Sequence, residues 1–342
     1  MRSMVLVLMA LVLVNLGGLG QGSPLVVYTY DSFVSFGPAK QIQTMFKAQT
    51  GTTVQFVATG DSRAMLSRLL NERSGAGTSA DVFVGVELND LDKATRGGAF
   101  VPLGAGDVPN LETTAPEVRF DPQSRLVPYE HGFITLIYDA DQISEDALPQ
   151  TLQALSEPRF RDKLLLMDPR TSSPGLSFLL WTIDEVGQEH FLPFWRRLLP
   201  NILTITPGWS EAFSLFAQGE APMMVSFSTD HAFDVIVNGN DNIRVLLLDN
   251  AGYRTIFGAG VVDTSDQPAL AKQFVNFLLS RPVQELLPTT EWMFPANPRA
   301  LLPIAFAQNA VRPPRALSLD AELVGENLDR WLKDWSNLIV GN

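Results

Sequence analysis

The chain has 342 residues, of which 46% are hydrophobic and 18% are charged, and it contains no cysteine. This composition is typical of a folded globular protein, and it excludes disulfide bonds, thiolate metal sites and a cysteine nucleophile. A formal net charge of -12 argues against nucleic acid as a partner, because phosphate backbones are bound by clustered Lys and Arg side chains.

The N-terminus has the pattern of a secretory signal peptide. Arg2 supplies a positive charge, and the apolar run from Val5 to Leu16 is too short to span a bilayer. Glycines follow, so we place the cleavage near Gly20 to Gly22 and assign residues 1–22 to the signal peptide. An uncleaved N-terminal anchor is the alternative. Because an exported chain without cysteine lacks the acceptor for a bacterial lipid anchor, we expect a soluble periplasmic protein.

Apolar, β-rich runs alternate with helical patterns along the rest of the chain. The predicted strands are 25–30, 53–58, 81–86, 134–138, 164–167, 203–206, 223–228 and 243–248. Strands that alternate with helices predict an α/β fold.

Four helices are indicated by capping residues and apolar spacing. The first opens at Gly37-Pro38 and stops at Gly51, and the second opens at Asp61-Ser62 and ends at Gly75. The third opens at Ser173-Pro174, with Ser173 as its expected N-cap, and stops near Gly187. The fourth is a C-terminal helix whose apolar residues recur at helical spacing from Leu323 to Leu338.

No Pro- or Gly-rich linker divides the chain, so two lobes would be joined by more than one short crossing. We expect residues 23–130 to form the first part of one lobe and residues 131–252 the second lobe. Residues 253–342 then return to the first lobe and add the C-terminal helices. A ligand would lie between the lobes, at the carboxyl ends of strands and the N-termini of helices.

Seven stretches together resemble one known family. They are "VYTYDSF", "FVATGD", "ADVFVG", "MDPRTSSPGL", "PGWSEAFSLF", "MMVSFST" and "EWMFPAN". In this order and at roughly this spacing, they are similar to the periplasmic thiamine-binding proteins of ABC importers. The resemblance runs from about Leu25 to the C-terminal helix, and "DPRTSSPGL" and "GWSEA" are its most specific parts.

The resemblance implies a two-lobed type II periplasmic binding fold, in which each lobe is a mixed β-sheet flanked by helices. It implies closure on thiamine, thiamine monophosphate or thiamine diphosphate, with no catalytic residue, cofactor or metal. The implied partners are this small molecule and an ABC permease of the inner membrane with its ATPase, and we expect a monomer. The implied ligand contacts are Tyr30, Asp61, Ser62, Ser172, Ser173, Trp209, Phe227, Phe233 and Trp292.

Several of these residue types suit a flat cationic ligand. Tyr30 stands at a strand end, where its ring can lie on a heterocycle, although a core tyrosine is the alternative. Trp209 and Trp292 can offer ring faces to a cation, or else pack in the core. Ser172 and Ser173 precede Pro174 at a helix N-terminus, where hydroxyls and N–H groups can hold polar atoms.

Other positions leave the ligand open. Asp61 is either an N-cap or a cleft residue that balances a cation, and its charge would repel a phosphate. Ser62 occupies a position that is glycine in the family, while Phe227 and Phe233 stand where the family has tyrosines. Stacking survives these changes but hydroxyl hydrogen bonds do not, so the phosphorylation state of the ligand stays open.

Two other kinds of binding protein are alternatives. A ferric site needs phenolate-rich hard oxygen ligands, commonly from adjacent tyrosines, but this chain has five tyrosines and no Tyr-Tyr pair. A polyamine site uses several carboxylates beside aromatic rings. Candidate carboxylates for it are Asp31, Asp61, Glu211 and Asp230.

A serine hydrolase is the distant alternative. "GWSEA" around Ser210 approaches the G-x-S-x-G nucleophile elbow, but Ala212 replaces the last glycine. His231 directly follows Asp230, whereas a triad normally takes its Asp and His from separate loops. We therefore expect a binding protein rather than an enzyme.

Overall fold

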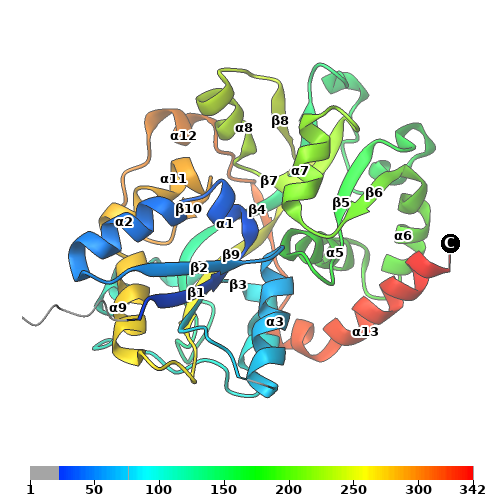
Figure 1. Cartoon of the computed structure of the whole chain (residues 1–342). Helices are drawn as coiled ribbons and strands as arrows, with labels where there is room; N and C mark the ends of the chain where they lie inside the picture. The colour runs from blue at the N-terminus through cyan, green and yellow to red at the C-terminus, as the bar shows by residue number, and fades with distance from the viewer. Residues whose placement is uncertain (1–22, 76, 342) are drawn as a thin grey trace, which may run out of the picture.

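The computed structural model describes residues 23–75 and 77–341 (Figure 1). The predicted signal peptide and its cleavage site, at residues 1–22, lie outside the described residues. None of the helices in the two described ranges combines the length and hydropathy that a bilayer crossing requires.

Eleven strands of the described residues join in one mixed sheet, with the order β2-β1-β3-β9-β4-β7-β5-β6; β8 and β10 pair with β4, and β11 pairs with β9. The strands are β1 (Leu25–Thr29), β2 (Val54–Ala58), β3 (Val82–Glu87), β4 (Val127–Asp139), β5 (Leu164–Met167), β6 (Ile202–Thr206), β7 (Met223–Phe227), β8 (Ile243–Leu246), β9 (Ala251–Val261), β10 (Phe294–Pro295) and β11 (Arg315–Leu317). The outer strands β2-β1-β3 and β7-β5-β6 are parallel, and β9 and β4 join them in antiparallel pairs. The α/β prediction is confirmed.

The helices lie on both sides of this sheet (Figure 1). They are α1 (Asp31–Ser35), α2 (Ala39–Thr50), α3 (Ser62–Ser74), α4 (Leu91–Thr95), α5 (Ser173–Val186), α6 (Phe191–Leu198), α7 (Trp209–Ala217), α8 (Asp230–Phe233), α9 (Pro268–Leu278), α10 (Arg281–Gln284), α11 (Leu287–Thr290), α12 (Ile304–Asn309) and α13 (Ala321–Val340).

The capping residues predict one end of each of three helices to within one residue. Gly51 ends α2 in the left-handed conformation, with a φ of 78°, which a glycine adopts without a steric cost. Asp61 caps α3 by accepting a hydrogen bond from the backbone N–H of Ser62. The cap predicted for α5 was wrong by one residue: Ser172 accepts from the N–H of Gly175, and Ser173 is the first helical residue. Pro174 then occupies an early helical position, where no N–H is needed.

The strands β4 and β9 connect the two parallel parts of the sheet. The strand predicted at 134–138 is only the second half of β4. The first half was not predicted, because Pro128 interrupts the pattern of a strand there. The structure accommodates Pro128 where the register between β4 and β9 shifts, as is usual for a proline in a sheet. The predicted lobe boundaries, after residues 130 and 252, fall within β4 and β9 and stay predictions.

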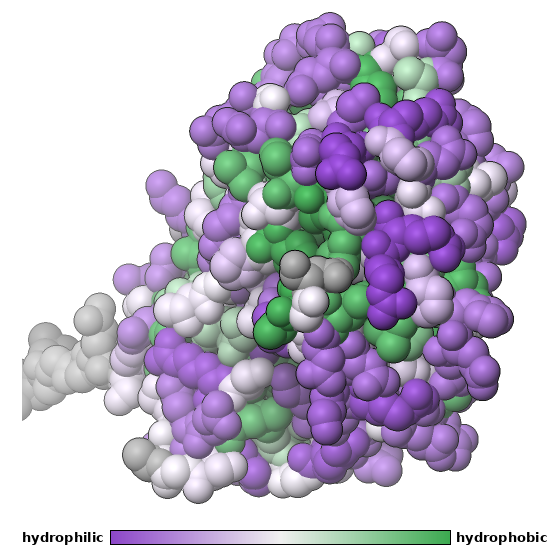
Figure 2. All heavy atoms as spheres, turned by 90° about the vertical axis from the view of Figure 1, so that its right-hand side faces the viewer, coloured by the Kyte–Doolittle hydropathy of each residue, from purple (hydrophilic) through white to green (hydrophobic). Residues whose placement is uncertain are grey.

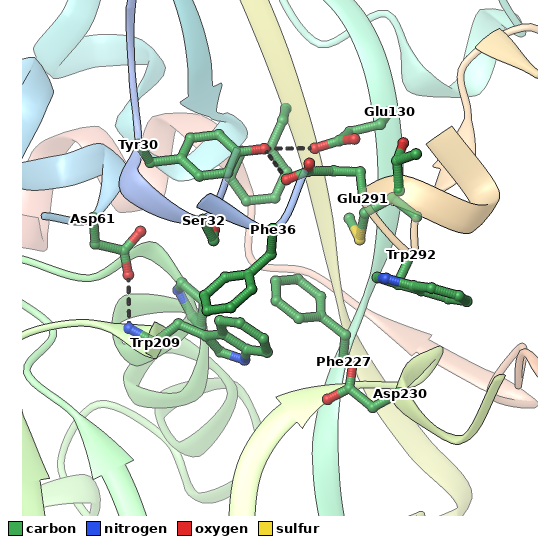
Figure 3. A pocket seen from close by; sticks show the side chains of 14 residues that line it. Tyr30, Ser32, Phe36, Asp61, Glu130, Trp209, Phe227, Asp230, Glu291 and Trp292 are labelled. Atoms are coloured by element: carbon green, nitrogen blue, oxygen red, sulfur yellow. Dashed lines mark hydrogen bonds between the residues drawn. The ribbon is translucent and has the colours of Figure 1, made fainter. Parts of the chain in front are cut away.

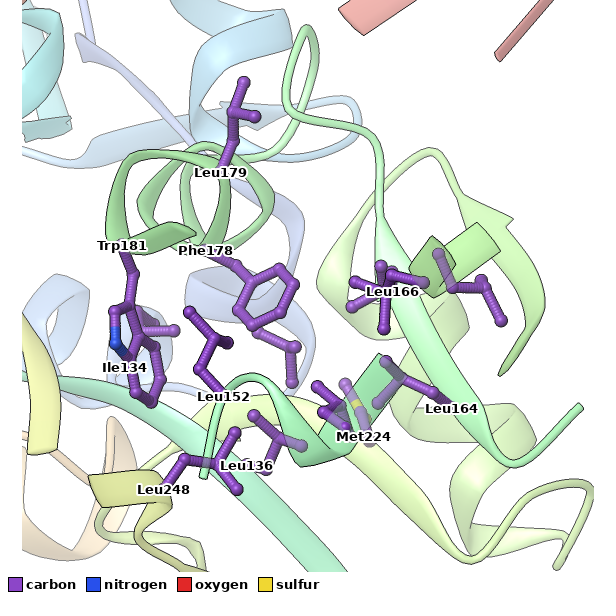
Figure 4. Packing of buried hydrophobic residues seen from close by; sticks show 14 of the residues in the cluster. Ile134, Leu136, Leu152, Leu164, Leu166, Phe178, Leu179, Trp181, Met224 and Leu248 are labelled. Atoms are coloured by element: carbon purple, nitrogen blue, oxygen red, sulfur yellow. The ribbon is translucent and has the colours of Figure 1, made fainter. Parts of the chain in front are cut away.

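Apolar side chains fill the space between the sheet and the helices. In the largest cluster, Phe178 and Trp181 of α5 point toward the sheet, among side chains that include Ile134 of β4 and Met224 of β7, all of them buried (Figure 4). Each such large side chain contributes roughly 1.5–3 kcal/mol when it is fully buried. A second cluster holds β1, β3, α2 and α9 together.

The predicted C-terminal helix is confirmed as α13, and it packs on the largest cluster. Trp331 and Trp335 are buried, and the ring of Trp335 meets that of Trp195 edge-on at 5.7 Å. Figure 2 shows the face on this side of the molecule, where hydrophilic residues surround a central group of hydrophobic ones.

Candidate functional site

A pocket lies between the two parallel parts of the sheet. Its space measures about 610 Å³, including the open mouth. The lining comes from segments far apart in the sequence (Figure 3). The lining residues are Tyr30, Ser32, Phe36, Asp61, Glu130, Pro174, Trp209, Phe227, Asp230, Phe257, Thr290, Glu291, Trp292 and Met293.

Aromatic rings form much of the pocket wall. Trp209 starts α7, Phe227 ends β7, and Trp292 follows α11, while Phe36 is 70% exposed. Figure 3 shows Phe36 and Phe227 beside Trp209, with Trp292 on the far side. Rings from three separate parts of the chain can therefore contact one flat ligand.

Phe233 does not line the pocket but supports rings that do. Its ring meets Trp292 edge-on at 5.3 Å and Phe213 at 5.8 Å, and Phe213 stacks on Trp209 at 4.8 Å. Trp292 itself has a φ of 56°, which is costly for a residue with a bulky side chain. Strained backbone of this kind is common at binding sites.

Tyr30 is the centre of a polar cluster at one end of the pocket. Its hydroxyl lies 2.6 Å from Oε1 of Glu291, 3.1 Å from Oε1 of Glu130 and 3.0 Å from the hydroxyl of Tyr129. Burial, followed by the charges of the two glutamates, raises the pKa of the Tyr30 phenol well above its usual value. The phenol is therefore neutral.

The carboxyl groups of Glu130 and Glu291 both have raised pKa values. Burial raises the pKa of Glu291 to about 8, and burial together with the charge of Glu291 raises the pKa of Glu130 well above its usual value. Two carboxylates this close cannot both ionise readily, so the pair keeps a proton at neutral pH.

Asp61 and Asp230 line other parts of the pocket. Asp61 accepts hydrogen bonds from the backbone N–H groups of Ser62 and Trp209, at 2.7 and 3.4 Å, and burial raises its pKa to about 6. Asp230 accepts from Ser226, which in turn accepts from the indole N–H of Trp209 at 2.9 Å. Burial raises the pKa of Asp230 to about 7.

The three predicted serines lie beside the pocket rather than in its lining. The hydroxyls of Ser62 and Ser173 are 2.5 Å apart and buried, and Ser172 caps α5. These residues hold the start of α3 against the start of α5. Their role as direct ligand contacts stays a prediction.

The pocket lining is acidic. Four carboxyl side chains line it, and no Lys, Arg or His is among its lining residues in the described part of the chain. The same ranges hold no group of three or more His, Cys, Asp or Glu side chains arranged for a metal ion. The arrangement favours a ligand that is flat, apolar on its faces and positively charged.

The hydrolase alternative finds no support in the geometry of Ser210. Its hydroxyl donates to Asp31 at 3.0 Å, and no hydrogen bond within residues 23–75 and 77–341 joins it to a histidine. Nδ1 of His231 lies 2.9 Å from the carbonyl oxygen of Ile243 instead.

The sequence did not predict the pairing of Glu130 with Glu291 or the contact between Tyr30 and Tyr129. Tyr30 and Tyr129 are 99 residues apart, so no local motif joins them. A signal was present in each case, because Glu130 lies within the buried strand β4 and Glu291 directly precedes Trp292. Charged residues in such surroundings are often functional.

The fold and the pocket between the parts of its sheet are those of a ligand-capturing protein. The chain belongs to the bacterial extracellular solute-binding proteins, whose family model matches residues 41–314.

Several relatives carry the name "Thiamine-binding periplasmic protein", and two of them show the range of identity. The one from Brucella abortus biovar 1 (strain 9-941) is 36% identical over 313 residues, which cover 91% of this chain and 90% of the relative. The one from Escherichia coli (strain K12) is 31% identical over 317 residues, covering 92% and 93%.

Solved structures agree with this assignment. A "Periplasmic thiamin binding protein" has a TM-score of 0.83 at 30% identity, covering 92% of this chain and 96% of that one. A ferric binding protein from Campylobacter jejuni has a TM-score of 0.75 at 18% identity, so it shares the fold alone. The predicted type II periplasmic binding fold is confirmed.

Proposed function

We propose that this protein is the substrate-binding component of an ABC importer and that it captures thiamine in the periplasm. One observation carries the proposal: aromatic rings from separate segments and four carboxyl groups line one pocket, and none of its described lining residues is basic. Thiamine has flat rings and a permanent positive charge, so both features suit it. The names of the relatives at 31–36% identity support the same ligand.

The mechanism we propose is reversible capture. Ligand enters between the two parts of the sheet, contacts Tyr30, Trp209 and Trp292, and is enclosed when the parts close on it. No bond is made or broken, so no catalytic residue is required. A monomer exported through a cleaved signal peptide would then deliver thiamine to a permease with its ATPase.

The phosphate esters are expected to bind more weakly than thiamine itself. Each adds negative charge to a pocket that holds the largely ionised Asp61 and the partly ionised Asp230, and none of its described lining residues is a cation that could balance this charge. The hydroxyl groups and helix N-termini near Ser173 would offset only part of this repulsion.

Calorimetry on refolded, ligand-free protein tests the proposal. Thiamine, its mono- and diphosphate, spermidine, putrescine and ferric citrate are titrated separately. Thiamine should bind most tightly, and it should raise the melting temperature by an amount that grows with the logarithm of its concentration over Kd. If thiamine and its esters released no heat while a polyamine or ferric citrate bound, the proposed function would be wrong.

A further inference from the structure

Helix α7, which begins with the pocket residue Trp209, lacks a capping side chain of its own. Its N-cap is Gly208, which has no side chain to accept hydrogen bonds from the first N–H groups of the helix. Serine, threonine, aspartate or asparagine usually occupies such a position. The first turn of α7 and the positive end of its dipole therefore need acceptors from elsewhere in the fold.

Two aspartates on the other side of the pocket supply these acceptors. Asp31 follows β1 and Asp61 follows β2, whereas α7 follows β6 in the other parallel part of the sheet. Oδ2 of Asp61 accepts from the backbone N–H of Trp209 at 3.4 Å (Figure 3). Oδ1 of Asp31 accepts from the hydroxyl of Ser210 at 3.0 Å. The first turn of α7 is thus capped from the opposite part of the sheet.

Asp61 contacts the starts of two helices at once. Its Oδ1 accepts from the N–H of Ser62 at the start of α3, while its Oδ2 accepts from the start of α7. Burial raises the pKa of Asp61 to about 6, so the carboxyl group is mainly ionised at pH 7. The positive ends of the two helices offset part of the cost of burying this charge.

Gly208 allows this close approach because it has no side chain. A Cβ at this position would lie 3.3 Å from the Cβ of Asp61, which is tighter than ordinary van der Waals contact. The φ of Gly208 is -151°, an extended conformation that any residue adopts. Space, and not backbone conformation, is therefore what a larger residue would lack here.

The loop before α7 is fixed to its own part of the sheet. The hydroxyl of Thr171 donates to the carbonyl oxygen of Pro207 at 2.6 Å, and the hydroxyl of Thr206 donates to that of Gly208 at 2.7 Å. These contacts do not involve Asp31 or Asp61, so they persist when the two parts of the sheet separate. The two aspartate contacts are the ones that separation would break.

The same contacts act on a ring that lines the pocket. Trp209 is the first residue of α7, and its indole N–H donates to Ser226 within its own part of the sheet. Its backbone N–H and the next residue are held by the opposite part. Contacts that form only when the parts come together slow the release of an enclosed ligand more than they change its entry.

We propose that Asp31 and Asp61 clamp the first turn of α7 across the pocket when the two parts of the sheet are together, and that Asp31 is a positioning residue for Trp209. The inference rests on the proposed capture of a ligand between the two parts, but not on that ligand being thiamine. Neither Asp31 nor Ser210 is among the described residues that line the pocket.

A double-mutant cycle tests the clamp with wild-type protein, Asp31→Ala, Ser210→Ala and the double variant. Stopped-flow tryptophan fluorescence gives the association and dissociation rates of thiamine, or of another ligand of the titration series if that one binds instead. Each single variant should dissociate about three- to tenfold faster, with association rates within about twofold of wild type. The double variant should stay within about twofold of Asp31→Ala, because both substitutions remove the same hydrogen bond.

The cycle separates the hydrogen bond from the charge of Asp31. Loss of that charge changes the binding of a cationic ligand equally with and without the Ser210 hydroxyl, so it does not contribute to the coupling. Ser214→Ala is the matched control. Ser214 lies on the exposed side of the same helix, where its hydroxyl accepts from Gln218, and its loss should leave both rates as in wild type.

Gly208→Ser provides a second, independent measurement. The serine hydroxyl can cap α7 locally, while its Cβ crowds Asp61. We expect the melting temperature of the ligand-free protein to stay equal or rise, while the ligand dissociates at least about threefold faster. A residue needed only for folding would lower the melting temperature instead.

The clamp would be rejected if Ser210→Ala accelerated dissociation by the same factor with and without Asp31, or if Gly208→Ser released ligand as slowly as wild type. Both results leave the proposed function intact, since wild-type thiamine binding is measured separately. If the wild-type protein bound a polyamine or ferric citrate but neither thiamine nor its esters, the proposed function would fail, and the cycle with that ligand would still decide the clamp. A protein that bound no ligand of the series would reject both proposals.

Discussion

The hydroxyl oxygens of Ser62 and Ser173 lie 2.5 Å apart, and this contact joins the start of α3 to the start of α5. The two helices pack on opposite parts of the sheet. A second contact beside it, from the N–H of Ala64 to the carbonyl oxygen of Thr171 at 3.2 Å, reinforces the junction. The approach of the two parts that encloses the pocket therefore depends on small polar groups.

Replacing one of these serines should weaken the closed arrangement. For Ser173→Ala we expect thiamine affinity to fall by about three- to tenfold, mainly through faster dissociation, because a hydrogen bond typically contributes about 0.5–1.5 kcal/mol. Stopped-flow tryptophan fluorescence measures the dissociation rate. Ser177→Ala is a matched control, since Ser177 is buried in the same helix and makes no hydrogen bond within the described residues. Equal dissociation rates in the two variants would contradict this role of Ser173.

Trp209 should be a major contributor to ligand affinity. Trp209→Ala removes a ring that lines the pocket, and a cation–π contact alone contributes about 0.5–2 kcal/mol, so we expect affinity to fall tenfold or more. Trp209→Phe keeps a ring but loses the N–H donor to Ser226. The ligand affinity of this variant should lie between that of the wild-type protein and that of Trp209→Ala. Unchanged calorimetric affinity in Trp209→Ala would show that this ring does not contact the ligand.

The ligand-free protein should lose stability as the pH rises. In the folded state the pKa is about 6 for Asp61, about 7 for Asp230 and about 8 for Glu291, against ordinary values of 3.8, 3.8 and 4.5. At these three groups the folded state thus binds more protons than the unfolded state, and their contribution to stability is fully present below pH 4 and lost as the pH rises through 8. Urea unfolding between pH 5 and 9 measures this trend, which should be flatter in Glu291→Gln. A rise in unfolding free energy between pH 6 and 8 would contradict the assignment.

Asp61 should help the pocket reject phosphate esters. Asp61→Asn removes the charge but keeps an oxygen that can cap α3, so the helix should be preserved. We expect thiamine to bind more weakly and thiamine monophosphate relatively better, which narrows the ratio of their Kd values. Competition titrations with thiamine and thiamine monophosphate measure the two Kd values in each protein. A ratio identical to that of the wild-type protein would show that the phosphate does not approach Asp61.

Local patterns in the sequence determined where most of the strands and the main helices lie. Alternating apolar runs located the strands, and Gly51, Asp61 and Gly187 marked helix ends, because backbone conformation at a cap depends on the residue there and its close neighbours. Motifs near Tyr30, Trp209 and Trp292 also identified residues that line the pocket. The resemblance of these motifs to a family supplied the fold that the comparisons confirm.

Only the tertiary structure decided which polar groups meet. The pairing of Tyr30 with Tyr129, Glu130 and Glu291 depends on β4, β1 and the segment after α11 coming together, and these are far apart in the chain. It also brings the hydroxyls of Ser62 and Ser173 together in a contact between α3 and α5. The charge state of a carboxyl group depends on its burial and on neighbours within a few ångströms. The spacing of residues along the chain does not give these distances, so the sequence alone could not predict them.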